Sequence, residues 1–355
     1  MPATKWDLSL SQAKVDELLA ELSPRPNLSP LILCHNNPDP DTIAGAYALN
    51  FLLNRKLGIK CTIGYGGVVT RAENKAMIQR LKIKMSALRK LSPAKFDSIL
   101  LIDAQPGSGN NLMSSRNALP LVVIDHHPFR KLSQKVRFHD IRPDYGATST
   151  IITEYILAAG LKIPTSIANA LLYGLKTDTN SLIRGACKAD HQAFNHLIPL
   201  TNPRVIGSIE RPELPVTYFE EYHRGLANIL IYRDTAICAL GKIETESIVP
   251  ELSDVMLRIE GISWSLCMGE NKDNVVLSLR SRSRKLKAGS ILVKLLGKSG
   301  SAGGHREMAG GITPVAGLSE IEKKLLCEKL VTDFLKMIKR PSSNPKRLIT
   351  DQSAS

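Results

Sequence analysis

From residue 31 onward, short apolar runs alternate with longer stretches whose apolar residues recur at helical spacing. Short apolar runs bounded by turn signals indicate buried strands, whereas an apolar residue every three or four positions indicates an amphipathic helix. The pattern predicts strands at 31–35, 61–65, 98–102 and 121–125, and helices near 42–56, 71–90, 147–159, 166–175 and 189–198. Such alternation is typical of a doubly wound, mostly parallel α/β domain, which we place at residues 29–199.

The stretches that flank this domain have different patterns. Residues 1–28 contain one amphipathic helix, at 7–22, which we expect to pack on the α/β domain or on a partner chain. Four prolines between 199 and 215 mark residues 200–224 as a linker. A second, smaller α/β domain is expected at 225–340, with strands at 235–242, 262–268 and 274–280, helices at 247–260, 288–297 and 319–338, and a glycine loop at 300–311. The tail at 341–355 has little apolar content and is expected to be disordered.

Composition narrows the class of protein. With 355 residues and 43% apolar content, the chain is long enough for two hydrophobic cores. No apolar run approaches the ~18 residues of a membrane span, and acidic residues interrupt the N-terminus early, so we expect no membrane association, no secretory signal and a cytoplasmic location. The six cysteines are scattered without a Cys-x-x-Cys pair, which favours ordinary buried thiols over structural zinc or disulfides.

The charge of the chain is strongly positive. A formal net charge of +14 favours an anionic partner or substrate. Arg280 and Arg282 directly follow an alternating strand pattern, where their guanidinium groups could bind phosphate oxygens in pairs. Lys294 and Lys298 lie in an apolar helical pattern and fit a solvated helix face equally well.

Potential metal ligands gather where the predicted elements end. His35, Asp39 and Asp41 follow the first strand, and Asp103, Asp125-His126-His127 and Asp178 follow later strands or a helix. The carboxyl ends of parallel strands meet at one edge of the sheet, and carboxylates with imidazoles suit a hard or borderline divalent cation. Six ligands are too many for one catalytic metal, but they suit two metals about 3.5–4 Å apart with a bridging carboxylate. The proposed ligands are His35, Asp39, Asp41, Asp103, His126 and Asp178.

Each of these motifs also has a plainer interpretation. Asp39 and Asp41 stand beside prolines and could be turn residues, and neighbouring histidines at a strand end are commonly on the surface. A calcium loop fits poorly, because it would use a longer run of oxygen ligands without histidines. The recurrence of acids and histidines at four element ends favours metal ligation over these alternatives.

Together the motifs resemble the DHH phosphoesterase superfamily, which includes RecJ nucleases, family II pyrophosphatases and the oligoribonuclease (nanoRNase)/pAp phosphatases. The matching motifs are His35-x-x-Pro38-Asp39-x-Asp41, Asp103, Asp125-His126-His127 and Asp178. Further along, Gly303-Gly304-His305-x-x-Met308-Ala309-Gly310 resembles the glycine-histidine loop of the DHHA1 substrate-binding domain. Ala302 stands where a third glycine is common and Met308 where a small residue is common. The resemblance is closest to the nanoRNase/pAp phosphatase branch.

The resemblance implies a mechanism and a set of roles. One metal would bind His35, Asp39 and Asp103, and the other Asp41, Asp103, His126 and Asp178. His127 would act on the phosphoryl group, with Asp125 orienting a histidine. The implied substrate-binding residues are Arg280, Arg282, Gly303, Gly304 and His305. Mn²⁺ is the expected ion, with Mg²⁺ or Co²⁺ as alternatives, and the expected substrates are short single-stranded RNA or DNA or nucleotide phosphates such as pAp. A homodimer stays open.

Several other functions remain open. Within the superfamily, the chain could be a RecJ-like single-strand exonuclease or a cyclic or linear dinucleotide phosphodiesterase. An aromatic content of 5% is low for base stacking along a strand, and the glycine-histidine loop argues against a pyrophosphatase. Outside the class, a non-catalytic nucleotide-binding regulator would usually have lost a metal ligand, whereas all six are present. A nucleic-acid-binding protein driven by charge would show a steep salt dependence of affinity.

Overall fold

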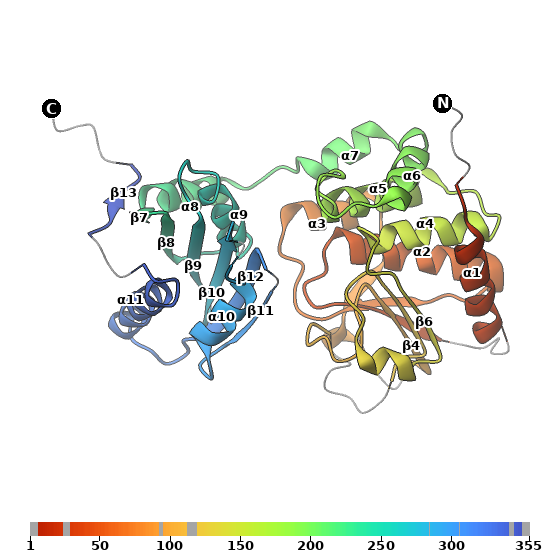
Figure 1. The fold of residues 1–355 in the computed structure, drawn as a ribbon, viewed down its shortest axis with the longest axis horizontal. Coiled ribbons are helices and arrows are strands. Elements are labelled where there is room, and N and C mark those ends of the chain that lie inside the picture. The colour runs from red at the N-terminus through yellow and green to blue at the C-terminus, as the bar shows by residue number, and fades with distance from the viewer. Residues whose placement is uncertain are drawn as a thin grey trace. The chain divides into compact units, whose positions relative to one another are not determined.

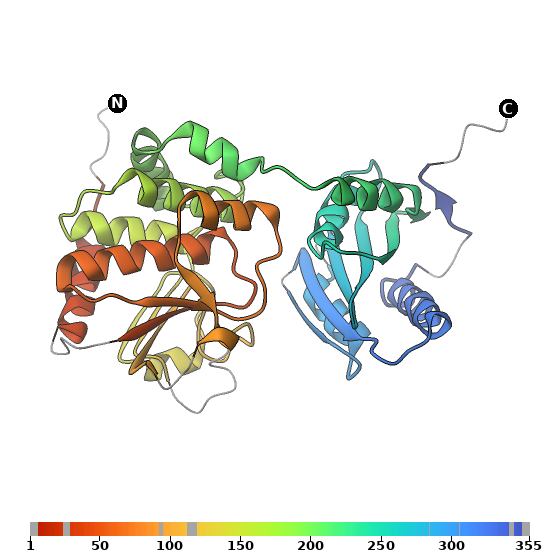
Figure 2. The ribbon, with the colours of Figure 1, turned by 180° about the vertical axis from the view of Figure 1, so that it is seen from behind.

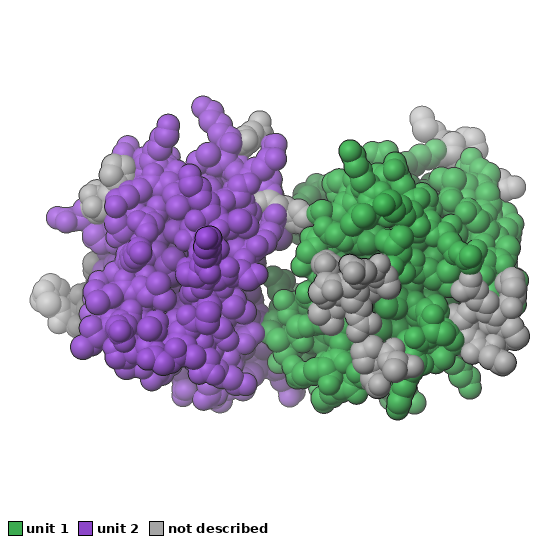
Figure 3. Space-filling view, turned by 90° about the horizontal axis from the view of Figure 1, so that it is seen from below, with its two compact units in different colours: residues 1–212 green, residues 213–355 purple. Residues whose placement is uncertain are grey.

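The computed structural model, drawn in Figure 1 and from behind in Figure 2, describes residues 6–23, 29–91, 95–111, 119–283, 285–304, 306–340 and 344–349. These residues form two compact units, unit 1 (1–212) and unit 2 (213–355), which Figure 3 shows in separate colours. The boundary lies within the stretch 200–224, which also holds helix α7 (Pro203–Glu210) and most of α8 (Val216–Ala227). Pro203 is in the first turn of α7 and Pro215 is the N-cap of α8, so these prolines start helices rather than prevent them.

Unit 1 is built on a parallel sheet. The described residues form six strands in the order β3-β2-β1-β4-β5-β6, and all neighbours pair in parallel. The strand order therefore reverses between β1 and β4, as in doubly wound folds, and this confirms the predicted fold class. The strands are β1 (Pro30–Cys34), β2 (Thr62–Tyr65), β3 (Met85–Ala87), β4 (Ser98–Ile102), β5 (Val122–Asp125) and β6 (Phe138–Ile141).

The helices of unit 1 create its main hydrophobic core. Both views show α2 and α4 on the same side of the sheet (Figures 1 and 2). Ile32 and Cys34 point into the core beneath these helices, while Leu31 and Leu33 point into a smaller core on the opposite face, because successive strand residues alternate between faces. The helices are α1 (Ser9–Leu22), α2 (Pro40–Leu57), α3 (Ala72–Arg80), α4 (Thr148–Ala158), α5 (Thr165–Asp178), α6 (Lys188–Leu197) and α7.

The N-terminal helix α1 packs on unit 1 itself. Its apolar side chains Val15, Leu18 and Leu22 are at most 1% exposed within the main core. Glu154 of α4 reinforces this packing, because its carboxylate accepts a hydrogen bond from Ser11 Oγ at 2.6 Å and pairs with Arg142 at 2.7 Å. Removing one partner of such a buried pair typically costs about 3–5 kcal/mol.

Two edge strands of unit 1 were not expected. The predicted helix at 71–90 ends at Arg80, because Lys82 adopts a left-handed backbone conformation (φ 52°) that no α-helix continues through. The chain then returns as strand β3 beside β2. Strand β6 follows a connection that contains the 3-10 helix Lys131–Lys135, and its two central residues, His139 and Asp140, are polar, so it produces no apolar run.

Unit 2 has a mostly antiparallel sheet covered by helices. Within the described residues the strand order is β11-β12-β10-β9-β8-β7-β13, and only β8 and β9 pair in parallel. Its strands are β7 (Leu230–Tyr232), β8 (Thr235–Lys242), β9 (Trp264–Asn271), β10 (Asn274–Ser281), β11 (Ser301–Gly304), β12 (Met308–Pro314) and β13 (Lys346–Arg347). Its helices are α8, α9 (Ile248–Met256), α10 (Ala288–Leu296) and α11 (Glu320–Met337).

Two expectations for unit 2 were wrong in detail. The stretch 300–311 is not an open loop, because most of it forms the hairpin of β11 and β12, with Gly303 paired to Gly310. Part of the tail is also ordered, since Lys346 and Arg347 pair with β7. Among the described residues, none of the helices combines the length and the apolar character that crossing a membrane requires.

Candidate metal centre and arginine pocket

The first motif lies at the junction of β1 and α2. Asp39 is the N-cap of α2, and its carboxylate accepts a hydrogen bond from the backbone N–H of Thr42 at 3.0 Å. Asp41 lies in the first turn of α2, where the helix dipole favours a negative charge. His35 Nδ1 donates to the carbonyl oxygen of Asn36 at 2.8 Å, since a carbonyl can only accept. The other ring nitrogen of His35, Nε2, therefore faces Asp39 Oδ1 at 3.5 Å.

Asp103 lies at the centre of the site. Its backbone has a φ of 54°, a left-handed conformation that costs a non-glycine residue of order 1–3 kcal/mol. The backbone N–H of Asp103 donates to the carbonyl oxygen of Ile124 at 2.9 Å and holds this turn. Oδ2 of Asp103 lies 3.6 Å from His35 Nε2, and Oδ1 lies 3.5 Å from His126 Nε2. One buried carboxylate thus faces both histidines, as a bridging ligand would.

His126 and Asp178 complete the second side of the site. His126 Nδ1 donates to the carbonyl oxygen of Tyr145 at 3.1 Å, which directs Nε2 towards Asp178 Oδ2 at 3.0 Å. Asp178 is the last residue of α5, where the helix dipole disfavours a negative charge. A cation at this position would offset that unfavourable interaction.

The six predicted ligands all come together. Among the described residues, ligand atoms lie within 4.8 Å of one another in the sets His35/Asp39/Asp103, Asp41/His126/Asp178 and Asp103/His126/His127. His126 Nε2 is buried and lies 3.0 Å from Asp178 Oδ2, but the two atoms do not form a hydrogen bond of acceptable geometry. Buried carboxylates and imidazole nitrogens that face one another in this way fit a divalent cation.

The titration of these groups also indicates that a cation belongs here. Burial and the neighbouring carboxylates of Asp41 and Asp39 raise the pKa of Asp103 well above its usual range. Burial and Asp178 raise the pKa of Asp41 to about 6. Burial alone would lower the pKa of His35, but the Asp39 carboxylate raises it to about 10. Without a cation the site holds protons that a bound metal would displace.

Helix α4 supports two of the carboxylates, a role that the sequence did not reveal. The backbone N–H groups of Thr148 and Ser149 donate to the two oxygens of Asp41 at 2.7 and 2.9 Å. The Thr148 hydroxyl donates to Asp103 Oδ1 at 2.9 Å. Gly174 of α5 permits this packing, because a Cβ there would lie 2.5 Å from Ser149 Oγ and 3.0 Å from Asp41 Cα. The run Thr148-Ser149-Thr150 before an apolar helix was the available signal.

His127 is held by Asp125. Asp125 is the last residue of β5 and fully buried, and its Oδ1 accepts a hydrogen bond from His127 Nδ1 at 2.8 Å. Burial opposes protonation of His127, but this hydrogen bond and the charges of Asp103 and Asp125 raise its pKa to about 8. The contact fixes the ring and turns its other nitrogen, Nε2, away from Asp125.

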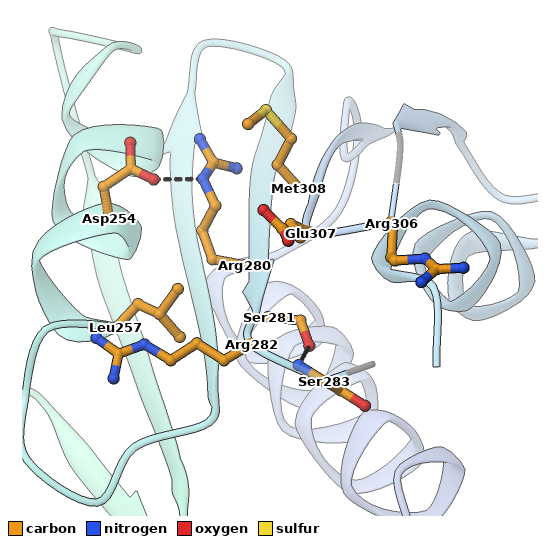
Figure 4. A pocket seen from close by; sticks show the side chains of 9 residues that line it. All are labelled: Asp254, Leu257, Arg280, Ser281, Arg282, Ser283, Arg306, Glu307 and Met308. Atoms are coloured by element: carbon orange, nitrogen blue, oxygen red, sulfur yellow. Dashed lines mark hydrogen bonds and ion pairs between the residues drawn. The ribbon is translucent and has the colours of Figure 1, made fainter. Parts of the chain in front are cut away.

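Unit 2 contains a separate pocket of about 530 Å³. Figure 4 shows Arg282 extending towards Leu257, while Arg306 comes from the turn between β11 and β12. Arg282 and Arg306 are exposed, whereas Arg280 is 8% exposed. The pocket is lined by Asp254, Leu257, Arg280, Ser281, Arg282, Ser283, Arg306, Glu307 and Met308. It combines cationic and apolar side chains, which suits an anion with an organic part.

The structure places the expected substrate-binding residues in different settings. Arg280 lines the pocket, but its Nε pairs with Asp254 and its Nη1 donates to Ser278 Oγ at 2.9 Å, so its charge is already partnered. Gly303 and Gly304 belong to β11 and are not among the lining residues. Gly304 has a φ of 153°, and a Cβ there would lie 2.3 Å from the Met308 carbonyl oxygen, so the hairpin itself requires glycine. His305 lies outside the described residues.

Comparisons with known proteins agree with this geometry. Residues 30–175 match the N-terminal domain of the DHH family. The chain is 31% identical over 313 residues to the uncharacterized protein MJ1633 of Methanocaldococcus jannaschii. The alignment covers 86% of this chain. The chain spans 62% of the length of that relative.

Two solved structures share the fold. An exopolyphosphatase-related protein from Bacteroides fragilis superposes with a TM-score of 0.71 at 18% identity, covering 92% of this chain and 98% of that protein. RecJ from Thermus thermophilus, solved in complex with Mn²⁺, superposes with a TM-score of 0.56 at 13% identity, covering 94% of this chain and 56% of RecJ. The matched residues 30–175 contain the strand-end motifs that unit 1 brings together, so this part of the chain is similar to the N-terminal domain of the DHH family.

Proposed function

We propose that the chain is a metal-dependent phosphoesterase that uses two divalent cations to hydrolyse phosphoester bonds in short oligonucleotides or the 3′-phosphate of pAp. The coarser assignment, a metal-dependent hydrolase, rests on the DHH family and on the acid and histidine clusters of unit 1. The single observation that carries the proposal is Asp103. One oxygen of this buried carboxylate faces His35 and the other faces His126, which is the arrangement of a ligand shared by two cations.

Manganese is the cation that we assign to the site. His35, Asp39 and Asp103 would hold one ion, and Asp41, Asp103, His126 and Asp178 the other. A mixture of imidazole and carboxylate ligands is softer than Mg²⁺ usually prefers, which favours Mn²⁺. The structurally similar RecJ of Thermus thermophilus has been solved with Mn²⁺ and with Mg²⁺, so the preference rests on the ligands alone. The bound ions would supply the Lewis acidity that activates water for attack on phosphorus.

The side chains around the cations would complete the chemistry. Asp125 holds His127 through Nδ1, so Nε2 is the atom that we assign to the phosphoryl group, either steadying a non-bridging oxygen or protonating the leaving oxygen. In the metal-free site the hydrogen bond to Asp125 outweighs the opposing effect of burial and raises the pKa of His127 to about 8, which favours a proton on this ring. The N-terminus of α4 keeps the Asp41 carboxylate in place throughout.

The pocket of unit 2 supports a nucleotide substrate. Arg282 and Arg306 offer two guanidinium groups, which bind phosphate oxygens well, and Leu257 and Met308 offer an apolar surface of the kind that a base or sugar contacts. None of the described lining residues is aromatic. Proteins that track long single strands use aromatic stacking, so a short substrate fits better than a long one.

The test is Mn²⁺-dependent product release from a panel of substrates. The panel contains a labelled dinucleotide, a five-residue RNA, a long single-stranded DNA, pAp and pyrophosphate. Fast release of mononucleotide from the short RNA, or of phosphate from pAp, is the expected result. Activity on long DNA alone would instead support an exonuclease like RecJ, and a lack of turnover on every substrate would contradict the proposal and favour a nucleotide-binding regulator.

A further inference from the structure

Gln105 is a buried amide beside the metal centre to which neither the motifs nor the mechanism assigns a role. It lies two residues after Asp103, in the loop that follows β4, and is 1% exposed. A buried amide of this kind must satisfy both its donor and its acceptor, so its hydrogen bonds show what it holds.

The acceptor side of Gln105 determines which way the amide points. Its Oε1 accepts hydrogen bonds from the backbone N–H of Arg130 at 2.8 Å and from Ser133 Oγ at 3.0 Å. A backbone N–H can only donate, so the amide oxygen has to face Arg130 and the NH₂ group has to face the other way. The orientation of the amide is therefore imposed by its surroundings.

The donor side of Gln105 contacts the Asp125–His127 pair. Its Nε2 lies 2.6 Å from Asp125 Oδ2, and the carbonyl oxygens of His127 and Pro128 lie 3.3 and 3.2 Å away. The two oxygens of Asp125 are thus divided, with Oδ2 bound to Gln105 and Oδ1 bound to His127 Nδ1 at 2.8 Å. Because Asp125 is 0% exposed, water cannot replace either donor.

We propose that Gln105 is a positioning residue that fixes the ring of His127 by holding Asp125. This inference rests on the phosphoesterase function proposed above and adds a residue to its site. Without the amide donor, the Asp125 carboxylate can rotate about its side chain, and the His127 ring turns with it. The main alternative is that Gln105 only ties two loops together and contributes to stability, with no effect on the orientation of His127.

The principal variant is Gln105→Met, which has nearly the same shape but no polar atoms. We expect kcat to fall about 10–100-fold, the range typical of groups that orient a catalytic ligand, while KM and Mn²⁺ affinity stay within about twofold. Ser133→Ala is the matched control, because it removes one partner of the amide oxygen and leaves the donor to Asp125 in place. Its kcat should stay within about twofold of the wild-type value.

A double-mutant cycle distinguishes positioning from a purely structural role. Asp125→Asn removes the carboxylate through which Gln105 would act on His127, so Gln105→Met should cost little further kcat in the Asp125→Asn background.

A measurement without turnover keeps this inference separate from the function. In the metal-free protein, the imidazole ¹⁵N signals of His127 should shift in Gln105→Met and stay unchanged in Ser133→Ala. If the wild type is inactive on every substrate, the phosphoesterase proposal fails, and the His127 signals still decide the role of Gln105. The positioning role is wrong if Gln105→Met leaves those signals unchanged. If the wild type is active, the role is also wrong if Gln105→Met keeps the wild-type kcat, or if the kcat losses of Gln105→Met and Asp125→Asn multiply in the double variant.

Discussion

The metal centre of unit 1 and the arginine pocket of unit 2 differ in how their polar groups are held. In the metal centre, Asp41, Asp103 and Asp125 are at most 1% exposed, and each accepts hydrogen bonds from residues distant in the sequence. In the pocket, Arg282 and Arg306 are exposed. Groups that take part in a reaction benefit from being fixed in advance, whereas groups that recognise a ligand can adjust to it.

The two arginines of β10 and its end show the same difference within one pocket. Arg280 is buried and pairs with Asp254, while Arg282, two residues later, lies beyond the strand and is exposed. Two arginines that are close together in the sequence can therefore differ in how accessible they are to a ligand. Changes to the fixed groups should therefore lower kcat, whereas changes to the adjustable groups should alter KM.

The largest effect is expected from Asp103→Asn. The amide keeps the size of the side chain but removes the negative charge that faces both histidines, so kcat should fall by at least about 10³-fold, well beyond the 10–100-fold typical of supporting groups. Initial rates at saturating Mn²⁺ measure the loss. Asp97→Asn, an exposed residue directly before the same strand, is the control and should turn over substrate at the wild-type rate. A rate within tenfold of wild type for Asp103→Asn would remove Asp103 from the centre.

Mn²⁺ affinity should increase with pH. In the metal-free site the pKa values of His35 and Asp41 are raised to about 10 and about 6, so both groups hold protons more tightly than usual and a cation must displace them. Raising the pH removes this competition, and affinity should rise by up to about tenfold per pH unit for each proton displaced. Calorimetry between pH 6 and 8, in buffers of different ionisation enthalpy, counts the protons released. A Mn²⁺ affinity that does not change over this pH range would contradict a buried site whose ligands hold protons before the cation binds.

A smaller and different effect is expected from Arg282→Ala. Its guanidinium is assigned to substrate binding alone, so KM for short RNA or pAp should rise while kcat stays unchanged. The rise should be about tenfold, because one charge-assisted hydrogen bond to the substrate is lost. Steady-state kinetics separate the two constants. Arg258→Ala removes an exposed arginine next to Leu257 that does not line the pocket, and it should leave KM unchanged. A fall in kcat with constant KM would mean that Arg282 acts in the reaction rather than in recognition.

The smallest effect is expected from Asp254→Ala. Removing this carboxylate takes a negative charge from the pocket and releases Arg280 from its ion pair, so KM for an anionic substrate should decrease. Because Asp254 is half exposed, the gain should be no more than about fivefold, in line with ion pairs of about 0.2–1 kcal/mol. The same kinetic measurement applies. An increase in KM would show that Asp254 itself contacts the substrate.

Much of the fold and of the metal site could be predicted from local sequence. Apolar runs identified four of the strands of unit 1, and the acids and histidines that follow them converge as expected, because parallel strands bring their carboxyl ends to one edge. The failures were at places where local pattern is weak. Strand β6 has polar residues, His139 and Asp140, at its centre and gives no apolar run, and the stretch 300–311 was expected to be a loop although most of it forms the hairpin of β11 and β12.

The sequence by itself determined which chemical groups reach the edge of the sheet in unit 1, since each ligand stands next to the element that carries it. Only the tertiary structure decided which atoms face one another. Thr148 supports Asp41 across 107 positions of the chain, Gln105 holds Asp125 across 20, and Asp254 pairs with Arg280 across 26. Such contacts depend on how separate elements pack, and no local pattern records them, because the hydrogen-bond partner of a buried group is set by distance in space rather than along the chain.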